Sequence, residues 1–76
     1  MPYETAQDRI LREITDDIRA GRLAPGDRLP SIREIACRYE VSEMPVRQAL
    51  RILRERGLTY VVSGVGTFVA DDATGR

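Results

Sequence analysis

The residues best suited to chemistry lie in the stretch VSEMPVRQAL, which runs from Val41 to Leu50. Ser42 is a typical residue to begin a helix, and the unpaired amides after it carry a partial positive charge that favours a phosphate. Arg47 follows about one turn later, and a guanidinium can bind guanine O6 and N7 together in the major groove of DNA. Arg51 shares the helix face of Arg47. These residues predict phosphate binding and base recognition.

The sequence offers no credible set of catalytic residues. It contains no histidine, and its acidic side chains fall on predicted helix surfaces. Cys37 is the only cysteine, which excludes an internal disulfide or a cysteine-based metal cluster and suits a reducing compartment. We expect Cys37 to be a half-buried structural residue of a helix. We therefore expect no enzymatic activity, no metal and no cofactor.

The charge of the chain is balanced but unevenly distributed. Twelve arginines face twelve acidic residues, and there is no lysine. Residues 33–56 hold six arginines and four glutamates, a net charge of +2, and the remainder holds six arginines and eight acids, a net charge of −2. So small an excess of positive charge does not distinguish nucleic-acid binding from arginines that are simply exposed to solvent on helix faces. Because no apolar run could span a bilayer and no secretory start is present, we expect a cytoplasmic protein without a membrane partner.

Hydrophobic periodicity predicts a first helix over residues 5–20. Thr5 can cap its start, and Gly21 can end it in a left-handed conformation. Asp8 and Arg12, four residues apart, are expected to form a surface pair. The apolar residues at steps of three and four, which form the predicted buried face, are Ile10, Leu11, Ile14 and Ile18.

A reversal and a second helix are expected next. The sequence APGD over residues 24–27 is typical of a type II turn, and Arg28 and Leu29 allow no more than a short edge strand. Ser31 and Glu34 form the pattern of a capping box, so a helix should begin there and run to about Tyr39. Its predicted inner residues are Ile32, Ile35, Ala36 and Tyr39.

A third helix and a hairpin complete the pattern. Only two residues separate the second helix from Ser42, so the two helices should cross steeply as a helix-turn-helix, and Gly57 should end the third. Residues 58–62 and 67–70 predict two strands around the turn SGVG, with Phe68 in the core and Tyr60 used for packing. The predicted apolar stripe of the third helix is Val46, Ala49, Leu50 and Leu53.

Together these elements predict an α+β, mainly α, winged helix-turn-helix domain, with three helices and a C-terminal β-hairpin as the wing. We expect the domain to cover residues 1–70. Residues 71–76 are polar, and we expect a flexible tail or the start of a linker to a further effector domain.

Several short motifs, in order and at fixed spacing, resemble one family. They are G-x-L-x-P-G at residues 21–26, LPS at 29–31, VS at 41–42, VRQAL at 46–50 and GVGTFV at 64–69. This combination resembles the DNA-binding domain of GntR-type bacterial transcription regulators over nearly the whole chain. The resemblance implies sequence-specific binding of double-stranded DNA by the reader module of a repressor.

The resemblance also implies particular contacts and partners. Arg33, in the first turn of the second helix, would touch DNA, and the wing tip at Ser63, Gly64 and Gly66 would enter the minor groove. A palindromic operator would require a homodimer of the full-length protein. A small-molecule effector would act through a domain after the wing.

Two residues, Glu43 and Pro45, depart from the family pattern. Glu43 stands where most relatives carry an arginine, and Pro45 stands where many carry a threonine. We interpret Glu43 first as a favourable charge at a helix N-terminus; its functional alternative is to accept a hydrogen bond from cytosine N4. Met44 would then meet a thymine methyl group. Pro45 removes the amide that Ser42 would cap.

Two other functions fit the same pattern. A neutral winged helix can serve as a protein-interaction module. Some members of the family join the reader to an aminotransferase-like domain that uses pyridoxal phosphate, in which case the parent protein would be an enzyme.

Overall fold

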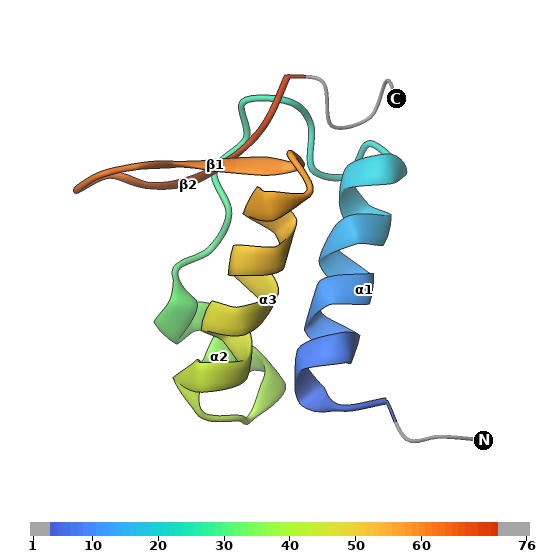
Figure 1. Cartoon of the computed structure of the whole chain (residues 1–76), viewed down its shortest axis with the longest axis vertical. Helices are drawn as coiled ribbons and strands as arrows, with labels where there is room; N and C mark the ends of the chain where they lie inside the picture. Colours follow the sequence, from blue (N-terminus) through green and yellow to red (C-terminus); the bar gives the residue numbers. More distant parts are fainter. Residues whose placement is uncertain (1–3, 72–76) are drawn as a thin grey trace.

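The computed structural model describes residues 4–71, in which three helices precede a two-stranded antiparallel hairpin. The elements are α1 Ala6–Arg19, α2 Ile32–Tyr39, α3 Glu43–Glu55, β1 Thr59–Val62 and β2 Gly66–Val69. Figure 1 shows α1 and α3 side by side, with α2 near one end of α3 and the hairpin across the other end. The expected winged helix-turn-helix fold is therefore confirmed, and the hairpin is its wing.

The boundaries expected for the domain are only partly covered by this description. Of the expected tail, Asp71 is described and residues 72–76 lie outside the described residues, as do residues 1–3. In the stretch from residue 4 to residue 71, no helix combines the length and the apolar character needed to cross a membrane.

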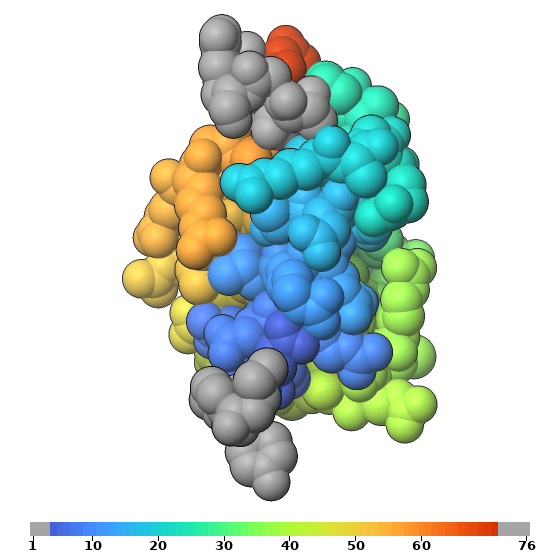
Figure 2. Space-filling model, turned by 90° about the vertical axis from the view of Figure 1, so that its right-hand side faces the viewer, coloured from blue at the N-terminus to red at the C-terminus, as the bar shows by residue number. Residues whose placement is uncertain are grey.

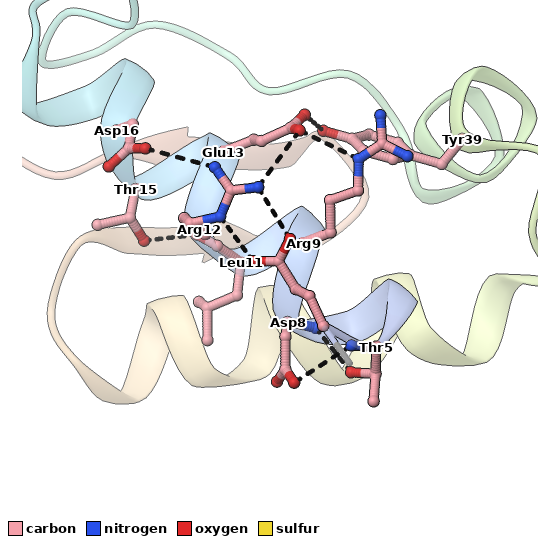
Figure 3. Close-up of polar contacts among 10 residues, drawn as sticks. Thr5, Asp8, Arg9, Leu11, Arg12, Glu13, Thr15, Asp16 and Tyr39 are labelled. Carbon is pink, nitrogen blue, oxygen red and sulfur yellow. Dashed lines mark hydrogen bonds and ion pairs between the residues drawn. The ribbon is translucent and has the colours of Figure 1, made fainter. Parts of the chain in front are cut away.

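Helix α1 begins and ends where the sequence predicts. The Thr5 hydroxyl accepts a hydrogen bond from the Asp8 amide at 3.0 Å, and Gly21 follows the helix with a φ of 83°. The expected pair between Asp8 and Arg12 is wrong. Arg12 instead donates two hydrogen bonds, of 2.6 and 2.9 Å, to the carboxylate of Glu4 (Figure 3). A bidentate contact with one carboxylate is stronger than a single surface pair along the helix.

A polar contact joins α1 to α2. The Tyr39 hydroxyl donates a 2.6 Å hydrogen bond to Glu13, and the Arg9 guanidinium lies 5.2 Å from the centre of the Tyr39 ring (Figure 3). Burial and then this hydrogen bond raise the pKa of Tyr39 to about 12. The same hydrogen bond, followed by one from Arg9, lowers the pKa of Glu13. The expectation that Tyr39 is used for packing is confirmed.

Helix α2 has the predicted capping box. The Ser31 hydroxyl accepts from the Glu34 amide at 3.1 Å, and the Glu34 carboxylate accepts from the Ser31 amide at 2.8 Å. The helix ends at Glu40, which adopts a left-handed φ of 58°. This residue reverses the chain, and the Val41 amide donates to the carbonyl of Ala36 at 3.0 Å. Three residues, 40–42, therefore connect α2 to α3.

The core lies where the three helices meet the hairpin. Each helix turns its predicted apolar face inward, and α1 covers one face of the molecule between α2 and the orange segment that follows α3 (Figure 2). The buried apolar residues are Ile10, Ile14, Ile18, Leu29, Ile35, Ala36, Val46, Ala49, Leu50, Leu53, Leu58 and Val69. The predicted inward faces of the three helices are thus confirmed.

Two expectations about side-chain burial are wrong. Phe68 is only half-buried, because β2 alternates its faces and Val69, opposite Thr59, points into the core. Phe68 stacks instead on Tyr60, with ring centres 5.7 Å apart. Cys37 is exposed, because it follows the inward-facing Ala36 by about 100° around α2.

The connection from α1 to α2 runs along β2. The turn at residues 24–27 has the expected glycine in a left-handed conformation, Gly26 at φ 87°. Arg28 then forms an isolated antiparallel bridge with Phe68, and the Leu29 amide donates to the Thr67 carbonyl at 2.8 Å. This segment therefore forms an isolated bridge and no third strand of the sheet. It places Arg28 beside the wing, far from it in sequence.

Candidate nucleic-acid interface

The N-terminus of α3 is less completely capped than that of α2. Ser42 precedes the helix with extended backbone angles, but its hydroxyl makes no capping hydrogen bond. The third helical residue is Pro45, which has no amide hydrogen to donate. The exposed Ser42 hydroxyl is therefore available to an external group, together with the first amides of the helix.

Glu43 and Arg47 form an ion pair on the exposed side of α3. Arg47 Nη2 donates to Glu43 Oε1 at 3.0 Å, and 57% and 45% of the respective side chains remain exposed. The contact was not part of our sequence-based interpretation of Glu43, although the two residues are four apart. One nitrogen of the guanidinium is engaged, so most of its five N–H donors remain free.

Met44 projects into solvent beside this pair. The Met44 side chain is 60% exposed, and the amide nitrogen of Gln48 lies 3.8 Å from its sulfur. Gln48 was missed by the sequence analysis. Its amide is the kind of group that binds adenine N6 and N7.

The arginines of α3 divide between two sides of the molecule. Arg47, Arg51 and Arg54 line a hollow of about 310 Å³ between α3 and the wing, whereas Arg56 lies toward α1. Arg51 also pairs with Glu55 at 3.3 Å. We call the hollow lined by Arg47, Arg51 and Arg54 the α3–wing hollow. Its other lining residues are Ile32, Leu50, Val61 and Thr67. The structure thus brings Arg51 together with Arg47, and adds Arg54, which the sequence analysis did not include among the site residues.

Arg33 and Arg38 lie on different sides of α2. Arg33 is exposed in the first turn, and none of the ion pairs within residues 4–71 involves it. Arg38 lines a separate hollow with residues of α1, including Asp17. Arg33 is therefore exposed at the start of α2, whereas Arg38 lies toward α1.

The wing tip is a tight turn without a bulky polar side chain. The Val65 amide donates to the Val62 carbonyl at 3.0 Å, and Gly64 has a φ of 77°. Ser63 and Val65 are exposed at the turn, and Gly66 begins β2. A backbone this bare can approach another surface closely.

With this geometry in place, comparison with known proteins decides the family. Residues 6–69 match the model described as "Bacterial regulatory proteins, gntR family". The chain belongs to the gntR family. This GntR domain has the winged-helix DNA-binding fold of that family. Among its relatives are the histidine utilization repressor of Klebsiella aerogenes, 38% identical over 84% of this chain, and the repressor NagR of Bacillus subtilis, 44% identical over 82%.

The GntR domain is a fraction of those relatives but most of one solved structure. It spans 27% of the Klebsiella aerogenes repressor and 26% of NagR. It is similar to the AraR DNA-binding domain in complex with operator ORX1, with a TM-score of 0.83 and 33% identity over 92% of this chain and 82% of that chain. A GntR family regulator from Listeria monocytogenes has a TM-score of 0.87 at 29% identity, over 95% of this chain and 63% of that chain.

In this GntR domain, the α3–wing hollow contains two of the residues expected at the site, and the others lie at the starts of α2 and α3 and at the turn of the hairpin. Arg47 and Arg51 line the hollow, Ser42, Glu43 and Met44 precede it on α3, and the turn of Ser63, Gly64 and Gly66 lies at the end of the hairpin. Sequence reasoning missed Arg28, because only the bridge to Phe68 places it at the wing.

Proposed function

We propose that this GntR domain binds a specific double-stranded DNA operator as the reader module of a transcriptional repressor. The observation that carries the proposal is the α3–wing hollow, which sets Arg47 and Arg51 on a helix beside a wing in the fold of an operator-bound domain. In helix-turn-helix proteins the second helix of the motif lies in the major groove. Here that helix is α3.

Each exposed residue has a role in this arrangement. Arg47 binds guanine, Ser42 and the first amides of α3 hold a phosphate, and Arg33 contacts the backbone from the start of α2. Met44 meets a thymine methyl group, and Arg51 lies further along the groove. The wing tip at Ser63, Gly64 and Gly66 approaches the minor groove, where little room exists for side chains.

Glu43 acts through Arg47 in this proposal. An acid at the first helical position favours the helix dipole, and the 3.0 Å contact also fixes the direction of the guanidinium. The same carboxylate can accept a hydrogen bond from cytosine N4 on the other strand or at a neighbouring base pair.

The full-length regulator requires more than this chain. One reader recognises one half-site, so a palindromic operator calls for a homodimer, and a further domain would bind the small-molecule effector. We propose a cytoplasmic location because the operator is part of the bacterial chromosome. A single copy of this domain should bind a half-site weakly, because it makes only half of the contacts of a dimer.

A titration of this chain with duplex DNA tests the proposal. Affinity should fall as salt rises, because each neutralised phosphate releases counterions, and backbone amide signals should shift at Arg33, Ser42, Arg47 and Gly64. A log–log salt slope near zero would contradict phosphate binding. Val61 and Val62 of β1 are exposed, which favours the alternative of a protein partner. If no amide signal shifted on addition of duplex DNA at low salt, that alternative would be supported.

A further inference from the structure

The wing has no charged residue of its own. From Leu58 to Ala70 the sequence contains neither an acid nor an arginine. A hairpin that enters the minor groove passes between two rows of phosphates, where a cation adds affinity. A cation for the wing must therefore come from another part of the chain.

Arg28 lies against the wing at the position of a missing side chain. Arg28 and Phe68 are bridge partners, so their side chains share one face of the sheet, and Gly66 occupies the same face two residues earlier. A Cβ atom on Gly66 would lie 2.8 Å from Arg28 Nε and 3.5 Å from Cζ. The guanidinium thus covers the bare backbone of Gly66, near the turn of the hairpin.

The backbone on both sides of Arg28 is fixed to β2. The Leu29 amide donates to the Thr67 carbonyl at 2.8 Å, and the Val69 amide donates to the Asp27 carbonyl at 2.9 Å. The base of the side chain is therefore held in register with the wing. Arg28 is an exposed residue, and none of the ion pairs among the described residues involves it.

Arg28 lies on the same surface as the arginines of α3. It lines a hollow of about 220 Å³ between the start of α2 and the wing, together with Ser31 and Val65. This hollow shares Ile32, Leu50 and Thr67 with the α3–wing hollow, so the two are adjacent. Arg28 also helps to lower the pKa of Glu34, after the larger effect of the hydrogen bonds with Ser31.

We propose that Arg28 is the DNA-binding cation of the wing, and that it binds a phosphate bordering the minor groove entered by the hairpin. The inference rests on the proposed function and adds a contact to it. Gly66 has a second role in this account: by lacking a side chain it leaves room for the guanidinium to lie along β2.

The salt dependence of DNA binding by Arg28→Ala tests this contact. Loss of one phosphate contact should lower the log–log salt slope by about 0.9, so the advantage of the unaltered chain should shrink about threefold between roughly 50 and 200 mM salt. The loss should be similar on all duplexes, and Arg28→Lys should restore most of it. Arg19→Ala, which removes the same charge at the end of α1, should leave the slope unchanged.

Gly66→Ala provides a second, independent measurement. The new Cβ would displace the flexible end of Arg28 and would also strain the backbone at Gly66, whose φ is 153°. The effect of Arg28→Ala is therefore measured within the Gly66→Ala background, where it should cause little further loss of affinity. Thermal unfolding of each variant would show that the fold is retained. Additive losses would contradict the proposed link between the two residues.

The outcomes separate this inference from the proposed function. If the unaltered chain binds no duplex, the proposed function fails. If it binds with a clear salt slope that Arg28→Ala leaves unchanged, only the role of Arg28 fails. A loss confined to one base pair in a binding-site selection would also overturn phosphate binding, because it would make Arg28 a base reader.

Discussion

The Glu43–Arg47 pair explains how an acid can stand at the start of the helix that we propose to read DNA. An unpaired carboxylate there would repel phosphate, but here its negative charge is offset by the guanidinium of Arg47, which lies 3.0 Å from it. The pair costs Arg47 one donor and restricts its direction, and the remaining donors can still bind a guanine edge. We therefore interpret Glu43 as a positioning residue for base selection.

Replacement of Glu43 by alanine should lower the preference for guanine at the base pair read by Arg47. Exposed ion pairs contribute about 0.2–1 kcal/mol, so the loss should be a few-fold, while affinity for random DNA rises because a repulsive charge is gone. Competition between duplexes that differ at one base pair measures both effects. Glu43→Gln, which keeps an acceptor, should fall between the two. Unchanged base preference in Glu43→Ala would show that Glu43 positions nothing.

Sequence reasoning reached some residues of this surface and could not reach others. Ser42 and Arg47 followed from a helix start and from helical spacing. The missing cap on Ser42 followed from Pro45, and the structure bears it out. Arg28 and Gly66 are distant in sequence, so only the pairing of the α1–α2 connection with β2 could bring them together.

At the scale of the elements, α2 depends on its capping box. The Ser31 hydroxyl accepts a 3.1 Å hydrogen bond from the Glu34 amide. An amide in the first turn has no backbone acceptor within the helix, so this hydrogen bond has no substitute there. Ser31→Ala should lower the free energy of unfolding by about 1 kcal/mol, whereas Ser31→Asp should retain most of it. Urea denaturation measures the difference. Equal stability of Ser31→Ala and the unaltered chain would contradict the role of the cap.

The reciprocal bond of the capping box makes α2 sensitive to acid. The Ser31 amide, first among several contacts, lowers the pKa of Glu34 in the folded chain. Between the folded and unfolded pKa values the unfolded chain binds more protons. The contribution is therefore complete above the ordinary glutamate pKa of about 4.3 and is lost as pH falls through the lower folded value. Glu34→Gln should therefore reduce the fall of the unfolding temperature at acid pH. If the fall were the same in Glu34→Gln, the loss of stability in acid would come from Glu4 and Glu13, whose pKa values are also lowered.

At the scale of the whole molecule, most of the fold could be predicted from the sequence because its signals are local. Caps, left-handed glycines and stripes at three- and four-residue steps fixed the helices, and their buried faces agree with the structure. The predicted burial of Phe68 and Cys37 was wrong, because the burial of each residue depends on which face of a short element meets the core. A four-residue strand contains too few alternations to decide that.

We propose that α3 reads DNA bases through Arg47. A binding-site selection with the unaltered chain would supply a preferred duplex, and affinities for it and for a scrambled duplex would then be compared with those of Arg47→Ala at one salt concentration. We expect the unaltered chain to bind the selected duplex clearly more tightly than the scrambled duplex. In Arg47→Ala this preference should fall by about 1–3 kcal/mol, and the affinity for scrambled DNA should change far less. Equal binding of both duplexes by the unaltered chain, or a preference that survives Arg47→Ala in full, would contradict it.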